Sequence, residues 1–377
     1  QMINSLRLGN FVTHENPIQR FTDGKLSDEF INYAEVISPL AVGLNNRVGK
    51  ILQQLNDQRN NSADKDSFSP AILEIGSYQS KTENLSNTWH LMQSEADPPI
   101  AKWVEWQDLG ASFDFRLHAS PISAAHNLAQ TLWSTSSAAI LTSATLRTMG
   151  DFQYFLRQTG LHWFPQTKTF EAESPFDYEK QGIFLVPDMD ECPSANASGH
   201  TTELSQAIPR ELSELQHGAL VLFTSKKQMK EVYDNLSNDF LQDVLMQGDL
   251  PRSKLITSHE QRINNGQRSI LFGMQSFGEG LDLPGKLCEI VVITKLPFAP
   301  PDSPVEEARS EWLEKNQGNP FYEISVPAVA LKLQQWVGRG IRTETDTAKI
   351  IVLDKRLKTK PYGKKLMAGL PPFKKLI

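Results

Sequence analysis

Short apolar segments that alternate with helical patterns most restrict the fold of this sequence. From about Gly182 onward, each apolar run is followed by a longer segment in which apolar residues recur every three or four positions. This alternation predicts a parallel sheet with helices on both faces, and ligands of such sheets bind beyond the carboxyl ends of the strands. The expected strands are 183–186, 219–223, 244–246, 269–272, 289–293 and 349–353, and the expected helices are 202–215, 225–236, 252–264 and 326–341.

The first hundred residues have a different pattern. Between 27 and 58, apolar residues form one helical stripe, and Ser27 is a suitable N-cap because acidic residues follow it. A second helix is expected over 71–92. Strands are expected at 103–106 and 113–117, where the residues alternate, and at 138–141, a short apolar run. The sequence therefore predicts a mainly helical segment ahead of the α/β part.

Composition excludes several classes of protein. The net charge is −6, so nucleic acid could bind only to a local basic patch. One candidate is 355–377, with eight Lys or Arg and no acid, although a solvated tail explains it equally well. The two cysteines, Cys192 and Cys288, exclude a disulfide framework and a four-cysteine cluster within the chain. No convincing carboxylate cluster for a metal-dependent nuclease is present, and no metal-ligating residues are expected here.

Hydroxyl side chains follow two of the expected strands. Thr142, Ser143 and Thr145 come after the run at 138–141, and Thr224 and Ser225 follow the strand at 219–223. Such hydroxyls can bind phosphate at a helix N-terminus, or they can simply cap the helix. Taken alone, these residues favour ordinary capping.

A glycine-rich loop at 273–285 is more specific. Glycine permits positive φ and close approach of the backbone to a ligand. The loop also carries Glu279 and Asp282 on either side of Gly280, and Asp282 could hold a ribose hydroxyl or a backbone amide. This combination favours a binding loop over a simple surface loop.

Two arginines near the end of the last expected helix complete the set. Arg339 and Arg342 are three residues apart, which would place both on one helical face, behind Gln335 and Gly338. Guanidinium groups fork onto phosphate and stay charged at all relevant pH values. The pair is therefore a candidate for stabilising charge during phosphoryl transfer.

Taken together and in this order, the motifs resemble those of the iron–sulfur superfamily 2 DNA helicases related to XPD. The resemblance is strong from about residue 103 to the end and weak before it. It implies a helical arch-like segment at 1–102, the C-terminal part of motor domain 1 at 103–166 and a RecA-like motor domain 2 at 167–377. The segments that carry it are 141–147, 221–225, 247–249, 275–283, 302–305, 335–342, 354–356 and 360–365.

The resemblance also implies a role for each candidate residue. Arg339, Arg342 and Gln335 would act on ATP as catalytic residues, with Gly280, Asp282, Glu279 and Gly338 at the same nucleotide interface. DNA contacts would come from residues that follow the strands, namely Thr142, Ser143, Thr145, Thr224, Ser225, Gln247 and Ser276. Of these, Thr142, Ser143 and Thr145 would also couple the nucleotide state to the grip on DNA.

For the whole protein, the resemblance implies ATP-driven 5′-to-3′ translocation on single-stranded or forked DNA in repair or replication. It implies ATP and Mg²⁺, a bacterial cytoplasmic location at the nucleoid, and single-strand-binding protein as a further partner. The chain has no G-x-x-x-x-G-K-[ST] phosphate loop and no acidic box for magnesium. We therefore expect a C-terminal portion that is inactive as an ATPase, with the 4Fe–4S cluster in a part that precedes it.

A non-catalytic module derived from a helicase domain is the alternative. Such a module would bind nucleic acid or a partner protein without hydrolysing ATP. It would have no need for Gln335 and the two arginines together with Glu279 and Asp282, which favours the helicase.

Overall fold

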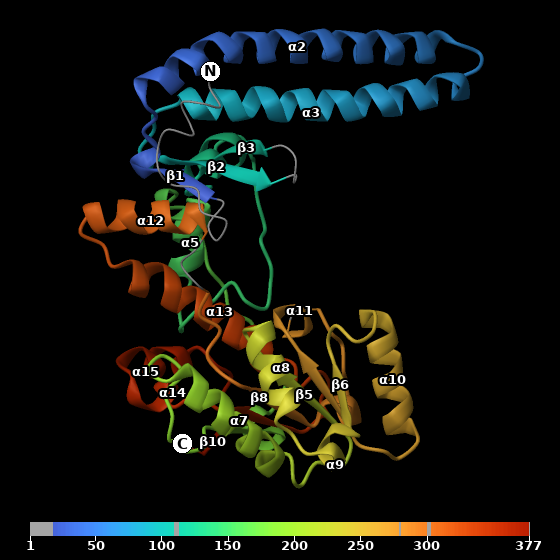
Figure 1. The fold of residues 1–377 in the computed structure, drawn as a ribbon, viewed down its shortest axis with the longest axis vertical. Helices are drawn as coiled ribbons and strands as arrows, with labels where there is room; N and C mark the ends of the chain where they lie inside the picture. Colours follow the sequence, from blue (N-terminus) through green and yellow to red (C-terminus); the bar gives the residue numbers. More distant parts are fainter. Residues whose placement is uncertain (1–17, 109–112, 279, 300–302, 377) are drawn as a thin grey trace. The chain divides into compact units, whose positions relative to one another are not determined.

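The computed structural model describes residues 18–108, 113–278, 280–299 and 303–376 of the 377-residue chain. The chain forms two compact units, which are drawn in Figure 1. The first unit is Gln1–Ala124 with Pro300–Pro320, and the second is Ala125–Ala299 with Phe321–Ile377. Each unit has its own sheet.

The first unit combines a helical hairpin with a small antiparallel sheet. The expected helices are confirmed as α2 (Asp28–Asn61) and α3 (Ser69–Gln93), and the Ser27 hydroxyl caps α2 by accepting from the Phe30 N–H. The sheet has the order β1–β2–β3, and α12 also belongs to this unit. The remaining elements are β1 (Ile18–Phe21), η1 (Thr22–Gly24), η2 (Asp66–Phe68), β2 (Ile100–Asp108), β3 (Phe113–Pro121) and α12 (Pro304–Lys315).

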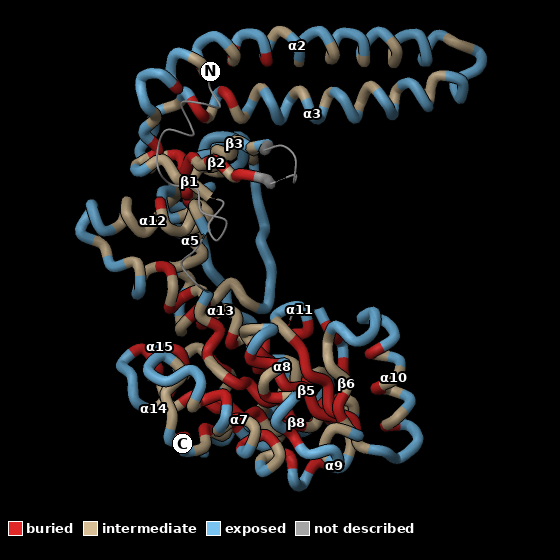
Figure 2. The backbone as a smooth tube through the Cα atoms, in the orientation of Figure 1, coloured by how far each residue is buried: buried red, intermediate tan, exposed pale blue. Residues whose placement is uncertain are grey.

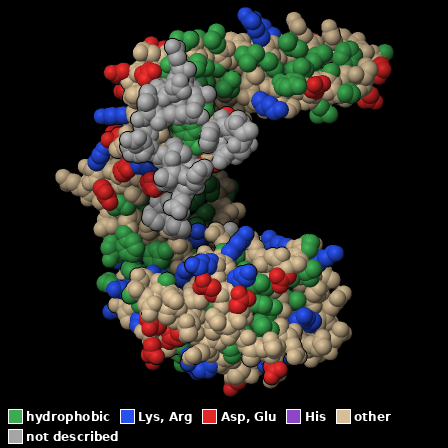
Figure 3. Space-filling model, viewed as in Figure 1, with side chains coloured by type: hydrophobic (Ala, Val, Ile, Leu, Met, Phe, Trp, Pro, Cys, Tyr) green, Lys and Arg blue, Asp and Glu red, His purple; other side chains and the backbone are tan. Residues whose placement is uncertain are grey.

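The hairpin is apolar at its base and exposed along most of its length (Figure 2). Phe30, Trp89 and Met92 are buried against Val104 of β2. Farther along, apolar side chains such as Leu40 and Leu73 are exposed, and Figure 3 shows hydrophobic side chains spread over α2 and α3. The base is therefore the part of the hairpin that packing against the sheet stabilises.

The second unit is built on a seven-stranded parallel sheet, as the strand and helix pattern predicts. Its strand order is β10–β4–β9–β8–β5–β7–β6, and all the pairings are parallel. The six strands expected from residue 183 onward are each present to within about one residue, and β10 is a further strand that was not expected. The strands are β4 (Gly182–Leu185), β5 (Gly218–Leu222), β6 (Val244–Met246), β7 (Ser269–Gly273), β8 (Ile290–Ile293), β9 (Ala348–Val352) and β10 (Lys374–Leu376).

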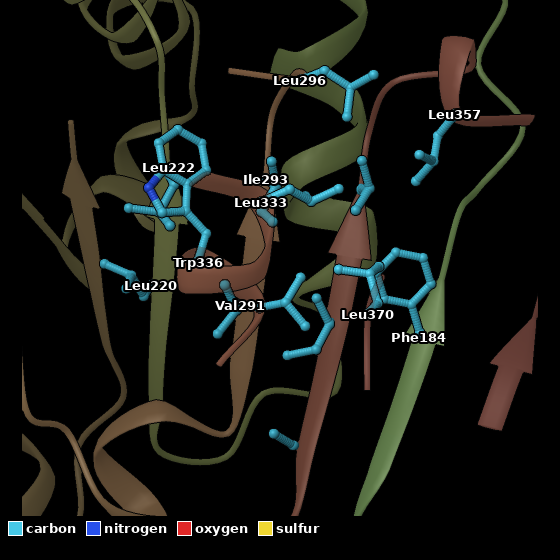
Figure 4. Close-up of a cluster of buried hydrophobic side chains, with 14 of the residues drawn as sticks. Phe184, Leu220, Leu222, Val291, Ile293, Leu296, Leu333, Trp336, Leu357 and Leu370 are labelled. Atoms are coloured by element: carbon cyan, nitrogen blue, oxygen red, sulfur yellow. The ribbon is translucent and has the colours of Figure 1, made fainter. Parts of the chain in front are cut away.

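Helices cover both faces of this sheet. On one face, the inward side chains of β5 and β8 pack with α13 and α15, and Figure 4 shows Trp336 and Leu333 of α13 beside Leu222 and Ile293. On the other face, Val221 and Val292 pack with α7 and α8. Alternate residues of one strand thus enter different cores, as a doubly covered sheet requires.

The helices and short helical turns of the second unit are α4 (Ala125–Leu128), η3 (Ala129–Trp133), α5 (Gln153–Thr159), η4 (Leu161–Trp163), α6 (Tyr178–Gln181), α7 (Ala197–Glu211), α8 (Lys226–Asp234), α9 (Asn238–Leu241), α10 (Arg252–Asn264), α11 (Gln275–Gly278), η5 (Gly285–Cys288), η6 (Phe321–Ser325), α13 (Val326–Val337), α14 (Arg356–Thr359) and α15 (Pro361–Ala368). Among the described residues, none of the helices has the length and apolar character needed to cross a membrane.

Two local predictions are wrong. The strand expected at 138–141 does not form, and Ile140 is 94% exposed. An apolar run cannot form a strand without a neighbouring strand to accept its hydrogen bonds, and neither sheet supplies one here. The last expected helix also stops early, because α13 ends at Val337 and Gly338 is its C-cap. Arg339 and Arg342 therefore lie in the turn after the helix.

Candidate functional site

Polar residues gather where three neighbouring strands of the second unit end. The parallel strands β5, β7 and β6 end at Leu222, Gly273 and Met246, so the loops that follow them leave from the same edge of the sheet. In an open α/β sheet this edge is where ligands bind. The predicted residues Thr224, Ser225 and Gln247 lie in these loops, and Ser276 lies in α11, the short helix that follows β7.

Gln247 joins two of these loops. Its side-chain Oε1 accepts a hydrogen bond of 2.7 Å from the Met274 N–H, and its Nε2 donates to the Ser276 Oγ over 3.1 Å. Gln247 itself is half-buried, whereas Ser276 is exposed. The amide thus fixes the loop after β7 and leaves the Ser276 hydroxyl accessible to a ligand.

Ser225 caps a helix, which is one of the two roles that its sequence position allowed. Its hydroxyl accepts from the Gln228 N–H at 3.4 Å and so caps α8. Both Ser225 and Thr224 are half-buried. The cap does not exclude phosphate binding, because the first N–H groups of a helix remain directed toward the same side as the hydroxyls.

The glycine-rich loop is held tightly against α13. The Trp336 ring is 1% exposed and fills the space beside Gly278, so that a Cβ at Gly278 would lie 2.1 Å from the Trp336 Nε1. Gly340 is similarly close to β9, with an ideal Cβ 2.6 Å from the Ala348 Cβ. Neither position accepts a side chain, which explains why glycine occurs beside the arginines.

The two arginines converge on this loop although no helix carries them. The Arg339 guanidinium donates from Nε to the Gly278 carbonyl and from Nη1 to the Leu281 carbonyl, both over 2.7 Å. The Arg342 Nη2 donates to the same Leu281 carbonyl over 2.9 Å. The shared acceptor brings the two cationic groups together. The expected pairing of Arg339 and Arg342 is therefore present, but the cause is the loop rather than helical spacing.

Asp346 fixes the turn that carries Arg342. Its carboxylate, which is almost fully buried, accepts from the Arg342 N–H, the Thr343 N–H and the Thr343 hydroxyl at 2.7–2.8 Å. Burial raises the pKa of Asp346, but these hydrogen bonds and one from Gly285 outweigh it, so the pKa is lower than usual. The carboxylate stays charged and holds the backbone behind the guanidinium.

Arg342 has one donor that no described residue satisfies. Its Nε is buried with no hydrogen-bond partner among the described residues, and it lies 3.9 Å from the Asp282 Oδ1, whose side chain is 82% exposed. An exposed carboxylate at this distance is a weak partner. The donor and its charge are therefore suited to an anionic group, such as a phosphate, that enters beside the loop.

The other predicted nucleotide residues lie in the glycine-rich loop and at the end of α13. Gly280 has a φ of +76°, which favours glycine, and Gly338 is exposed at the end of α13. Gln335 is half-buried in the last turn of the same helix. Glu279 lies outside the described residues. Within the described part of the chain, no group of three His, Cys, Asp or Glu side chains is arranged to hold a metal ion.

Arg252 is a neighbour of the loop that the sequence reasoning missed. Its guanidinium carbon lies 5.6 Å from the centre of the Phe277 ring, and its Nη2 is 3.7 Å from an ideal Cβ at Gly280. The residue begins α10, directly after Pro251. The signal that could have identified Arg252 was a basic residue at the start of a helix that follows a strand. The apolar periodicity predicted the helix but did not single out this residue.

The hydroxyls at 142–145 make a separate local turn. The Ser143 Oγ and the Thr145 Oγ1 are 3.3 Å apart, and the Thr145 N–H donates to the Ser143 Oγ. Thr142 and Ser143 are exposed. Their role in DNA contact stays a prediction.

The chain is similar to known helicases. The helicase C-terminal domain family matches residues 208–373. The ATP-dependent DNA helicase DinG of Photobacterium profundum is 36% identical over 384 residues, which cover 100% of this chain and 55% of that protein. DinG of Escherichia coli strain K12 is 33% identical over 358 residues, which cover 94% of this chain and 50% of that protein.

Solved structures show the same fold. Xpd4 of S. tokodaii has a TM-score of 0.52 at 15% identity, over 96% of this chain and 72% of that one. An XPD helicase has a TM-score of 0.50 at 14% identity, over 96% of this chain and 66% of that one.

The solved XPD structures share the fold of this chain, and the matched helicase C-terminal domain at residues 208–373 defines its class as that of the helicases. Within that class it is a homologue of DinG, and the predicted RecA-like α/β architecture with a helical N-terminal segment is confirmed. The chain spans about half the length of these DinG proteins, at 55% and 50% of the two relatives.

Proposed function

We propose that this chain supplies the second motor domain of an ATP-dependent DNA helicase that moves 5′ to 3′ on single-stranded DNA in repair or replication. One observation carries the proposal. Arg339 and Arg342 converge on the Leu281 carbonyl, in the glycine-rich loop that follows β7 of the parallel sheet. Two rigidly held guanidiniums beside a glycine-rich loop suit the stabilisation of charge on a transferring phosphoryl group.

The other predicted residues are assigned by their places in the sequence. We assign Gly280, Asp282, Glu279, Gly338 and Gln335 to the nucleotide side of the loop. We assign Thr224, Ser225, Gln247 and Ser276, with Thr142, Ser143 and Thr145, to the DNA backbone. Contacts to phosphate carry no sequence information, which suits a motor that must move over any sequence.

The proposal also divides the chain. Residues 1–102 would serve as the arch, 103–166 as the end of motor domain 1, and 167–377 as motor domain 2. ATP would be bound jointly with a phosphate loop and a magnesium-binding acid that lie in another part of the protein, which would also hold the 4Fe–4S cluster. This chain then contributes the arginines but not the phosphate cradle.

Replacing Arg339 tests the proposal. In the longer protein that contains this chain, Arg339→Ala should lower ATP turnover about a thousandfold, because arginine fingers contribute at least that much. Affinity for single-stranded DNA should change by less than about threefold. Steady-state hydrolysis and fluorescence anisotropy give the two values, and thermal melting confirms folding.

The control is Arg210→Ala, which removes an exposed arginine that pairs with Glu211 on α7. It should leave turnover unchanged, while this chain alone should show no turnover. An Arg339→Ala protein that is folded and hydrolyses ATP at the normal rate contradicts the assignment.

A further inference from the structure

A cluster of four aromatic rings lies on the second unit, outside the arginine site. Phe298 and Phe321 are stacked, with ring centres 5.7 Å apart and planes 11° from parallel. Tyr362 packs edge-on against both of them, and Tyr322 packs edge-on against Phe321 at 5.3 Å. We call Phe298, Phe321, Tyr322 and Tyr362 the aromatic platform. Such geometries are favourable for aromatic pairs and hold the rings in fixed positions.

A buried ion pair supports the platform from below. Asp354 is 0% exposed and accepts from the Leu296 N–H at 2.9 Å and from the Arg356 Nη2 at 2.6 Å. The Arg356 guanidinium in turn lies over the Phe298 ring, 5.3 Å from its centre. Because the base is locked by charge and hydrogen bonds, the outer rings do not need to move to meet a ligand.

The outer rings are accessible. Tyr362 is 8% exposed, as expected of a packing residue, but Phe321 is 38% and Tyr322 is 41% exposed. The Lys365 ammonium lies 5.6 Å from the centre of the Tyr322 ring. An exposed aromatic pair beside a cation is a surface to which a flat, electron-rich and negatively charged ligand is complementary.

The surrounding charge comes from the basic C-terminal segment. Six Lys or Arg and no acid occur between 355 and 365. Lys355 and Lys358 are engaged with the loop after β4, at the Asp190 carbonyl and the Asp188 carboxylate. The other lysines, Lys360, Lys364 and Lys365, are exposed. On α15, Lys364 and Lys365 are exposed, whereas Tyr362 and Leu366 are buried.

The platform and the predicted DNA contacts share one edge of the sheet. Phe298 follows β8, and Asp354 and Tyr362 follow β9. In the sheet, β9 and β8 are directly followed by β5, β7 and β6, whose loops carry Thr224, Ser276 and Gln247. One extended polymer could therefore follow the edge from those loops to the platform.

We propose that the aromatic platform is a base-stacking site for single-stranded nucleic acid. Bases stack on Tyr322 and Phe321, and Lys360, Lys364 and Lys365 bind the adjoining phosphates. The inference rests on the proposed helicase function and names the surface that holds the strand. Stacking accepts every base, so the site grips the strand without reading its sequence.

Tyr322 provides the test, because it is the most exposed ring. Binding of this chain to a fluorescent oligothymidylate should weaken roughly five- to 100-fold for Tyr322→Ala, the range expected for loss of one stacked base. Tyr322→Phe keeps the ring and should bind like the unmodified chain. Tyr322→Ala and the unmodified chain should bind an oligomer of the same length without bases with equal affinity.

Lysine and distant aromatic variants complete the design. Lys364→Gln should reduce the slope of log affinity against log salt by about 0.7, because one phosphate contact is lost. Phe170→Ala removes an exposed phenyl ring elsewhere in the second unit and should have no effect. Three results would overturn the proposal. Tyr322→Ala could bind the oligothymidylate normally, it could lose as much affinity for the base-free oligomer, or free ATP could compete with the oligomer for the platform.

The proposed helicase function is judged separately. If Arg339→Ala abolishes turnover in the longer protein while Tyr322→Ala binds DNA normally, the platform alone is rejected. If the unmodified chain does not bind single-stranded DNA, the platform and the assignment of DNA contacts to this unit both fail.

Discussion

At the scale of single residues, a buried carboxylate decides where a catalytic candidate lies. Asp346 bonds the Arg342 N–H, the Thr343 N–H and the Thr343 hydroxyl. Asp346→Ala leaves these buried donors without an acceptor, so we expect the free energy of unfolding to fall by about 2–3 kcal/mol. Urea unfolding measures the change. Glu344→Ala, an exposed acid in the same turn, should change it by less than about 0.5 kcal/mol.

The same turn shows what residue patterns can predict. Sequence indicated that Arg339 and Arg342 act together, and the structure brings both to the Leu281 carbonyl. The stated reason, a shared helical face, was wrong because α13 ends at Val337. Asp346 and Arg252 were missed, because their importance depends on contacts with residues distant in sequence or on backbone donors that no periodicity reveals.

At the scale of elements, β10 was not predicted because all of its residues are exposed, whereas the central strands of the parallel sheet were predictable because they are buried. β5 and β7, for example, are buried at every position, which requires a continuous apolar run. The run at 138–141 has the same local character but lies outside both sheets. Apolar composition therefore predicts a strand only where tertiary structure provides a neighbour, and a single sequence does not show that neighbour.

Gly→Ala substitutions at two positions should change the stability in opposite directions, because only one of the two glycines lies close to another element. A Cβ at Gly278 would clash with the Trp336 ring, whereas one at Gly43 in α2 would meet nothing within 4 Å. We expect Gly278→Ala to lower stability by about 1–3 kcal/mol through overpacking. Gly43→Ala should raise the stability of its helix by about 1 kcal/mol. Urea unfolding followed by circular dichroism compares them, and a stable Gly278→Ala variant would contradict the packing argument.

At the scale of the whole molecule, compact units need not follow the order of the chain. The first unit takes in Pro300–Pro320, which is separated in sequence from the rest of it by Ala125–Ala299, the segment that holds β4 to β8 of the second sheet. Within that unit, Ala308 of α12 packs with Ala101 and Ile122, and Arg20 pairs with Glu307. Pairings over nearly 300 residues leave no trace in local patterns. The functional division at residues 102 and 166 stays a prediction.

Two buried histidines make the stability of the second unit depend on pH. His259 is 0% exposed and bonds the Ser269 hydroxyl and the Leu287 carbonyl through its two ring nitrogens. His200, also 0% exposed, bonds the Leu353 carbonyl. For both, burial is the main cause of a pKa below the usual 6.5. The folded unit therefore keeps both rings neutral at pH values where the unfolded chain is already protonated.

The direction of the pH effect follows from proton uptake. Above pH 6.5 both histidines are mainly neutral in the folded and the unfolded chain, so stability does not depend on their protonation. Below pH 6.5 the unfolded chain binds these protons first. Stability therefore falls as the pH falls toward the pKa values of the folded state. Each histidine contributes a slope of up to about 1.4 kcal/mol per pH unit. Urea unfolding between pH 7.5 and 5 should show this slope. His259→Gln should reduce it, while His162→Gln, an exposed control, should not. A stability independent of pH over this range would contradict the assignment of neutral, buried rings.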